Sequence, residues 1–125
     1  MSDAAPYTGL RYDEMPSLWD GFANLVRPGL GLSAFGANVM NLPPDYETKA
    51  HDESDSGQEE LYVALAGSGA IVVADERVAL DPECAVRVGP GTSRVLASGP
   101  DGLRVLIIGG VPGHAYVAPE WSSGG

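Results

Sequence analysis

Apolar residues from Ser33 onward fall into short runs, several of which alternate with polar residues at a period of two. Such runs are typical of β-strands, and the glycine, proline and aspartate residues between them favour turns. The predicted strands cover residues 33–42, 60–66, 70–74, 76–80, 85–88, 93–97 and 103–111, with turns that include Gly-Ser-Gly at 67–69 and Gly-Pro-Asp-Gly at 99–102. No interval is long enough for crossover helices, so the pattern predicts an all-β antiparallel sandwich or barrel.

The chain before residue 33 follows a different pattern. Met15, Trp19, Phe22 and Val26 recur at the spacing of one helix face, which predicts a short helix after an extended segment over residues 1–12. Residues 111–125 are predicted to form a loosely held tail. No linker interrupts the sequence, so we expect one domain over 1–125, with a barrel at 34–110 and an N-terminal strand and helix within 1–32.

The charge balance excludes some classes of partner. The chain has 17 acidic and 7 basic residues, a formal net charge of −10, which repels nucleic acid and anionic membrane surfaces. No apolar run approaches the roughly 20 residues that span a bilayer, and the first residues do not have the pattern of a signal peptide, so we expect a cytoplasmic protein. Cys84 is the only cysteine, which rules out an internal disulfide, and we expect a small buried side chain there.

The segment from Asp45 to Glu60 concentrates charge without apolar periodicity. A charged run of this kind is ordinarily a solvated loop. Here it contains His51, Glu53 and Asp55 and leads directly into a predicted strand that begins at Glu60, which also makes it a candidate for ligand or proton chemistry.

Two stretches resemble the motifs of the cupin superfamily. Glu60, the six residues LYVALA and Gly67 are similar to the second half of the first cupin motif, and GPGTSR at 89–94 is similar to the second motif. The resemblance covers residues 34–110 and implies the cupin double-stranded β-helix, a jelly-roll barrel. The most similar members are small single-domain bacterial cupins, which are commonly dimeric, so the resemblance implies a homodimer.

The motifs depart from the metal-binding pattern of the family, which implies three histidines and a glutamate. His51 is followed by Glu53 at the next histidine position, and Arg94 stands in place of the last histidine. Six residues separate Glu53 from Glu60, and a second register would put Glu53 and Asp55 in the histidine positions, with His51 outside. In the second motif only Gly91 keeps its place, because the usual Gly, Pro, His and Asn are replaced by Glu83, Gly89, Arg94 and Ser98.

These departures weaken the case for a metal. His51, Glu53 and Glu60 offer one imidazole and two carboxylates, a harder donor set than the histidine-rich one that zinc and iron favour. Arg94 has no lone pair to donate and would add a like charge beside a cation. The residues are therefore compatible with a divalent ion, manganese, iron, nickel or zinc, and equally with no metal at all.

Arg94 has two alternative roles. An arginine inside a barrel needs a negative partner, and Glu60 is the candidate for an internal salt bridge. Alternatively, Arg94 clamps an anionic group of a small ligand while His51 or Glu60 moves a proton. Tyr62 lies two residues after Glu60, so it shares the same strand face and is a further candidate for lining the pocket.

Three functional hypotheses remain. The first is a small-molecule-binding barrel with Arg94 as an anion anchor, and His51, Glu60 and Tyr62 as further ligand contacts. The second is a metal-dependent enzyme of the isomerase, epimerase or dioxygenase kind that uses His51 and Glu60. The third is an assembly module in which the N-terminal strand and the Trp19 helix pair with a second copy.

Overall fold

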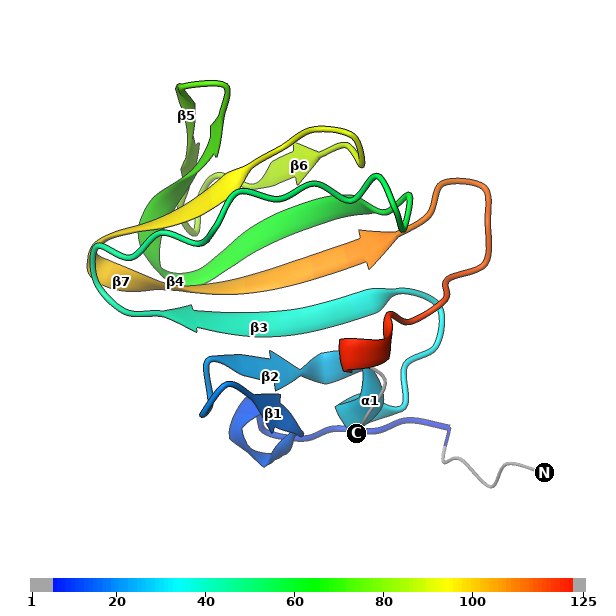
Figure 1. Ribbon diagram of the computed structural model, residues 1–125. Coiled ribbons are helices and arrows are strands. Elements are labelled where there is room, and N and C mark those ends of the chain that lie inside the picture. Colours follow the sequence, from blue (N-terminus) through cyan, green and yellow to red (C-terminus); the bar gives the residue numbers. More distant parts are fainter. Residues whose placement is uncertain (1–5, 123–125) are drawn as a thin grey trace.

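The computed structural model of the protein describes residues 6–122, which form one antiparallel sheet of seven strands in the order β1-β2-β3-β7-β4-β5, with β6 paired to β4 (Figure 1). The all-β prediction is confirmed. The strands are β1 Ser17–Leu18, β2 Ala23–Leu25, β3 Gly36–Leu42, β4 Glu59–Val73, β5 Glu76–Leu80, β6 Val86–Val88 and β7 Val95–Gly110. The helical elements are short: α1 Val26–Leu30, with 3-10 turns at Tyr12–Glu14 and Glu120–Ser122.

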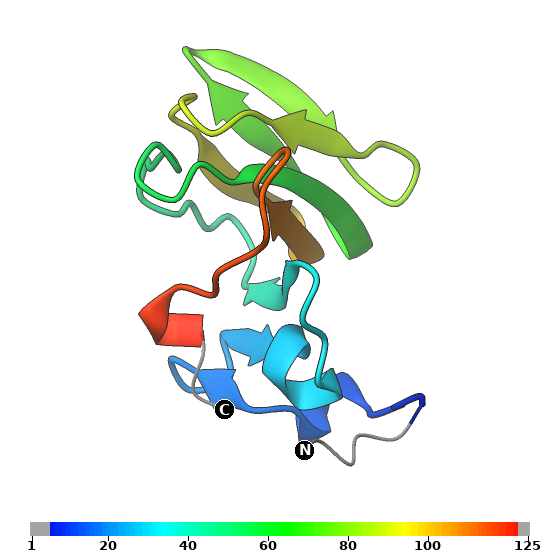
Figure 2. The same ribbon diagram turned by 90° about the vertical axis from the view of Figure 1, so that its right-hand side faces the viewer.

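The two longest strands close the barrel, because each contributes to both of its walls. The first half of β4 pairs with the second half of β7 and with β6, whereas the second half of β4 pairs with the first half of β7 and with β5. The register shifts between Ala64 and Ala66 and again between Gly67 and Gly69. These irregularities bend the sheet so that its two halves face each other (Figure 2).

Two of the predicted turns are therefore wrong. Gly-Ser-Gly at 67–69 and Gly-Pro-Asp-Gly at 99–102 lie within β4 and β7 and bend the strands without reversing them. Gly67 and Gly102 have positive φ values of 77° and 80°, and a Cβ atom at Gly67 would collide with the Gly102 carbonyl oxygen. The glycines let the two paired backbones approach each other closely, which is a common role of glycine inside a strand.

The predicted helix over Met15 to Val26 is also wrong in its position. The segment is a hairpin of β1 and β2, and its turn places Trp19 and Asp20 at positive φ. Asp-Gly at 20–21 favours such a turn, and the pairing of β2 with β3 supplies long-range hydrogen bonds that a helix would forgo. Trp19 is 60% exposed, and the described part of the predicted N-terminal strand, residues 6–11, belongs to no strand.

Apolar side chains form two cores on opposite faces of the sheet. β3 shows the division, because Ala37 and Val39 face the outer core, whereas Leu42 joins the inner one. The inner core lies inside the barrel and comprises Leu42, Tyr62, Ala64, Ile71, Leu80, Val86, Val88, Leu96, Leu103 and Val105. The outer core comprises Met15, Val26, Ala37 and Val39, so the N-terminal segment covers the outside of the sheet.

Cys84 is exposed, which corrects the expectation of a buried side chain, because it lies in a turn where its backbone N–H bonds to the Asp81 carbonyl. Within residues 6–122, no helix is long and apolar enough to cross a membrane.

Candidate functional site

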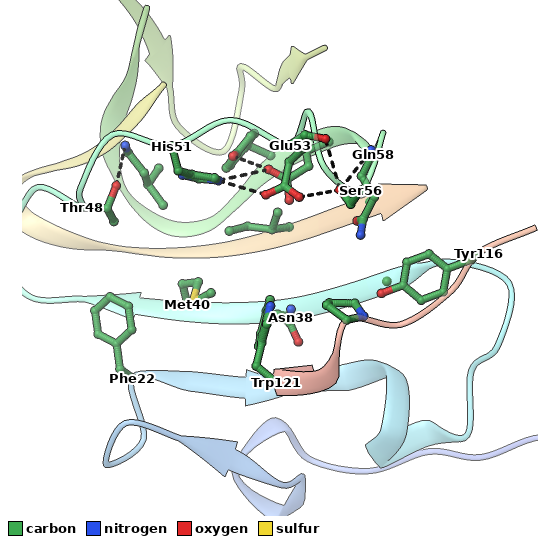
Figure 3. A pocket seen from close by; sticks show the side chains of 17 residues that line it. Phe22, Asn38, Met40, Thr48, His51, Glu53, Ser56, Gln58, Tyr116 and Trp121 are labelled. Atoms are coloured by element: carbon green, nitrogen blue, oxygen red, sulfur yellow. Dashed lines mark hydrogen bonds and ion pairs between the residues drawn. The ribbon is translucent and has the colours of Figure 1, made fainter. Parts of the chain in front are cut away.

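A cavity of about 190 Å³ opens between the inner face of the barrel and the C-terminal segment. One wall carries polar side chains from residues 48–60, and the facing wall carries apolar and aromatic ones from β3, the β1–β2 turn and the tail (Figure 3). The lining residues are Phe22, Gly36, Asn38, Met40, Thr48, His51, Glu53, Ser56, Gln58, Glu60, Tyr62, Leu96, Ile107, Gly109, Tyr116, Pro119 and Trp121. A cavity with this division of chemistry is typical of a small-molecule site.

Backbone pairing with β7 positions His51. The His51 N–H donates to the Arg94 carbonyl at 3.1 Å, and the Arg94 N–H donates back to the His51 carbonyl at 2.9 Å. Three residues earlier, the Thr48 N–H donates to the Leu96 carbonyl at 3.0 Å, so this segment runs as an added edge beside β7. The imidazole thereby reaches the cavity, with 46% of the side chain exposed.

Glu53 is held by the loop that follows. Its N–H donates to the Pro90 carbonyl at 2.7 Å, and the Gly57 N–H donates to the Glu53 carbonyl at 2.7 Å. The Ser56 hydroxyl donates to Glu53 Oε1 at 2.8 Å and orients the carboxylate. Asp55 is exposed and does not line the cavity, so the structure has the register that brings His51 and Glu53 to the pocket.

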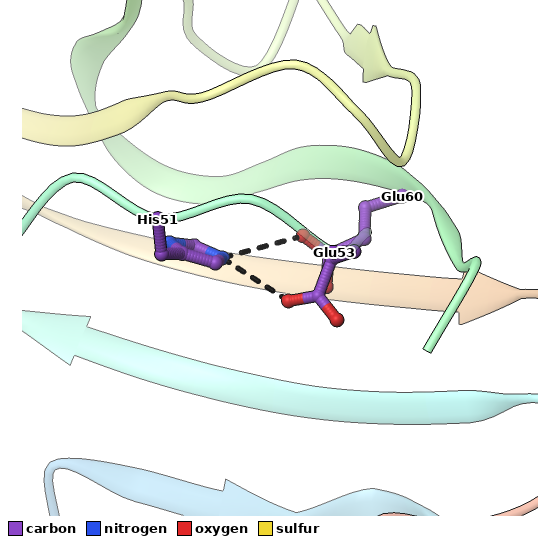
Figure 4. A group of neighbouring side chains, drawn as sticks. All are labelled: His51, Glu53 and Glu60. Atoms are coloured by element: carbon purple, nitrogen blue, oxygen red, sulfur yellow. Dashed lines mark ion pairs between the residues drawn. The ribbon is translucent and has the colours of Figure 1, made fainter. Parts of the chain in front are cut away.

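His51, Glu53 and Glu60 converge on one point (Figure 4). His51 Nε2 lies 3.3 Å from Glu53 Oε2 and 4.0 Å from Glu60 Oε1, and one ligand atom from each residue lies within 4.8 Å of the others. Two bonds of about 2.1 Å to a shared ion place ligand atoms at most about 4.2 Å apart, so the two distances from His51 fit one cation. The group could hold a metal, with a donor set that favours a hard divalent ion.

Glu60 is at the same time part of a buried network with Tyr62 and Arg94. Glu60 Oε1 accepts from the Tyr62 hydroxyl at 2.7 Å and from Arg94 Nη2 at 2.9 Å, and Arg94 Nε donates to the Tyr62 oxygen at 3.2 Å. Arg94 Nη1 donates to the Thr92 carbonyl at 2.8 Å. Three of the five N–H groups of the guanidinium are therefore engaged, and its side chain is 0% exposed.

Burial and charge act on the ionisation of this network. Burial raises the pKa of the Tyr62 hydroxyl well above its ordinary value, and the Glu60 carboxylate raises it further. For Arg94, burial favours the neutral form, but the hydrogen bond from its Nε to Tyr62 and the charge of Glu60 outweigh it and raise the pKa. Tyr62 therefore stays a neutral donor and Arg94 a cation at physiological pH.

The structure separates the sequence candidates into two groups. His51, Glu53, Glu60 and Tyr62 line the cavity, whereas Arg94 lies behind Glu60 and does not reach the cavity surface. The internal salt bridge is the role of Arg94 that the geometry supports. A ligand in the cavity cannot contact its guanidinium directly, so the role of an anion anchor does not fit this geometry.

Sequence reasoning missed the opposite wall of the cavity. Phe22 comes from the β1–β2 turn, Asn38 and Met40 from β3, and Tyr116 and Trp121 from the tail. The rings of Tyr46, Phe22, Trp19 and Trp121 contact one another in series, with centroid distances of 5.6, 6.5 and 5.9 Å. The aromatic residues of an otherwise Gly/Pro-rich tail were the available signal.

Comparison with solved structures identifies the fold. The chain is similar to a cupin protein from Bacteroides fragilis (19% identity, TM-score 0.71, 97% of each chain) and to the cupin domain of an XRE family transcriptional regulator from Enterobacter cloacae (15%, 0.61, 72% of this chain and 95% of that one). A predicted oxalate decarboxylase from Thermotoga maritima is also similar (20%, 0.55, 62% and 68%).

No family model and no curated protein matches the sequence. The protein nevertheless has the cupin fold, and the resemblance seen in its two motifs is confirmed at the level of the fold.

Proposed function

We propose that the protein binds a small organic molecule in the cavity between the barrel and the C-terminal segment. The observation that carries this proposal is the cavity itself, about 190 Å³ in volume, with polar groups on one wall and apolar groups on the other. An apolar cavity of about 150 Å³ is known to accommodate benzene, so this one is large enough for a ligand with one ring. The polar wall fixes the orientation of the ligand and the apolar wall contributes most of the buried area.

Methyl NMR tests this proposal, because neighbouring residues on β3 and β7 face opposite sides of the sheet. Single-ring fragments should shift the methyl resonances of Met40 and Ile107, which line the cavity, and leave those of Val39 and Leu106, which belong to the outer core. Shifts confined to the outer pair, or no shifts across a panel of cationic, neutral and anionic fragments, would reject the proposal.

A divalent cation is the second candidate ligand, and the convergence of His51, Glu53 and Glu60 favours it. When bound, such an ion would act as a Lewis acid that polarises a carbonyl or hydroxyl group of the organic ligand. His51 would contribute a neutral nitrogen and the two glutamates negative oxygens, while Tyr62 and Arg94 hold Glu60 in place. This arrangement is the basis for the alternative of a metal-dependent enzyme of the isomerase, epimerase or dioxygenase kind.

If the cation site forms, His51→Ala should weaken Mn²⁺ binding at least tenfold, because one of three ligands is lost. Isothermal titration of the chelator-treated protein with Mn²⁺ measures this change. His114→Ala is the matched control, since His114 is exposed and lies outside the cavity, and its affinity should equal that of the wild type. Equal binding by both variants would place any bound Mn²⁺ elsewhere on this acidic protein.

A further inference from the structure

The charge of the cavity lining is negative. Glu53 and Glu60 line the cavity, with 23% and 14% of their side chains exposed, and none of the described lining residues is a lysine or arginine. The nearest fixed positive charge, on Arg94, is completely covered by protein and is already paired with Glu60. An anionic ligand would therefore meet uncompensated carboxylate charge, whereas a cationic ligand would be attracted by it.

The cavity also has an excess of hydrogen-bond acceptors. Asn38 faces it from β3, and its Oδ1 is buried without a hydrogen-bond partner among the described residues (Figure 3). This oxygen is covered by protein, so the acceptors that a ligand reaches are the two carboxylates. The carboxylate oxygens of Glu53 and Glu60 lie in the same cavity and come from the facing wall. The ligand that satisfies these groups carries several N–H or O–H donors at one end.

The rest of the cavity is suited to a small apolar body. Phe22, Met40 and Trp121 line it opposite the carboxylates, and the ring centroids of Trp121 and Trp19 are 5.9 Å apart. Aromatic rings in this position can contact an apolar group and can also face a cation. The aromatic rings offer no ligand atom to a metal, so a metal alone leaves them unused.

Glu60 distinguishes between the two kinds of cation. Its Oε1 already accepts two hydrogen bonds, from Tyr62 and Arg94, and the Arg94 guanidinium nitrogen lies 2.9 Å away. A divalent ion must take a lone pair directly and is repelled by the guanidinium twice as strongly as a single charge. An ammonium group needs only a hydrogen bond, which the Glu53 carboxylate can accept without disturbing the network.

Building on the proposed function, we infer that the organic ligand is a primary amine that bears a small apolar or aromatic group. The ammonium group donates to Glu53 and Glu60, and the apolar group lies against Phe22, Met40 and Trp121. Its three N–H donors match the acceptors of the cavity, and its single positive charge matches the uncompensated carboxylate.

Three ligands of nearly the same size test the inference. Benzylamine, benzyl alcohol and benzoate each carry one ring, and at pH 7 their polar ends are cationic, neutral and anionic respectively. Titrations in chelator-containing buffer, followed by the methyl resonances of Met40 and Ile107, should show benzylamine binding at least tenfold more tightly than benzyl alcohol, with benzoate weakest. This order would establish a preference for amines.

Charge-neutralising variants separate a direct contact from the general field of an acidic protein. Glu53→Gln should weaken benzylamine binding about tenfold, the loss expected for one charge-assisted hydrogen bond, and leave benzyl alcohol unaffected. Glu59→Gln is the matched control, because Glu59 lies next to the cavity residue Glu60 but pairs with Arg87 and does not line the cavity. Its affinity for benzylamine should stay within twofold of the wild type.

The outcomes distinguish the inference from the proposed function on which it rests. Benzyl alcohol or benzoate binding at the cavity methyl groups as tightly as benzylamine would overturn the preference for amines and leave the small-molecule site intact. Equal losses in Glu53→Gln and Glu59→Gln would reject the direct contact with Glu53. If none of the three compounds binds, both the inference and the single-ring site fail together.

Discussion

Arg94→Ala should lower the free energy of unfolding by about 3 kcal/mol, because it leaves the Glu60 carboxylate and the Tyr62 hydroxyl without their shared partner. The wild-type guanidinium donates to both groups and to the Thr92 carbonyl, and it is fully enclosed by protein. Urea unfolding at pH 7, followed by circular dichroism, measures the change.

The neighbouring ion pair provides a control of the same chemistry. Arg87 Nη1 lies 2.9 Å from Glu59 Oε2, the same distance as in the Arg94–Glu60 pair, but the two side chains are 68% and 42% exposed. Exposed ion pairs contribute less than about 1 kcal/mol to stability, so Arg87→Ala should lower the free energy of unfolding much less than Arg94→Ala does. Similar losses in Arg87→Ala and Arg94→Ala would show that burial does not distinguish the two pairs.

A double variant tests whether the cost comes from the stranded partner. Arg94→Met with Glu60→Gln removes both charges and keeps much of the volume, and it should recover part of the stability that Arg94→Ala loses. A double variant less stable than Arg94→Ala would instead indicate that the charge on Glu60 stabilises the fold by itself. The two measurements together separate the strength of the pair from the penalty of breaking it.

The sequence predicted the centre of this network because it depends on local rules. Glu60 and Tyr62 are two residues apart on one strand and therefore project to the same side, where the hydroxyl of Tyr62 reaches Glu60. Arg94 could be assigned as the partner of Glu60 because a charge inside a barrel requires one, whereas the hydrogen bonds that Tyr62 makes with both residues were not predicted. The sequence could not decide between the two roles of Arg94, internal salt bridge and ligand anchor, because the choice depends on whether the guanidinium reaches the cavity.

The sequence could not predict the wall of the cavity that faces Glu53. Phe22 was assigned to a helix face because the spacing from Met15 to Val26 matches a helix, but pairing of β2 with β3 overrides that local pattern. Trp121 reaches the cavity through a tail with no periodicity, so no rule of spacing predicts its position. Asn38 alternates with buried apolar residues on β3, and nothing in that pattern shows which face encloses a cavity.

Gly67 and Gly69 have the sequence pattern of a turn but lie within β4, and the close packing there leads to a second large effect. Gly69→Ala should destabilise the protein by about 3 kcal/mol, because the added Cβ would collide with the Ala97 carbonyl oxygen and lie 3.1 Å from Ser98 Cα. These are backbone atoms of the paired strand β7, which cannot move aside without breaking the ladder between β4 and β7.

Gly91→Ala is the control for Gly69→Ala, since it adds the same atom at an exposed loop glycine where nothing lies within 4 Å. Its free energy of unfolding should change by less than about 0.5 kcal/mol. If Gly69→Ala proved as stable as Gly91→Ala, the close approach of the β4 and β7 backbones at Gly69 would be contradicted. The close approach also matters for the cavity, because the bend beside Gly69 turns the sheet so that its two halves face each other. A Gly69→Ala variant that folds by moving β4 and β7 apart should therefore also bind single-ring ligands less tightly than the wild type.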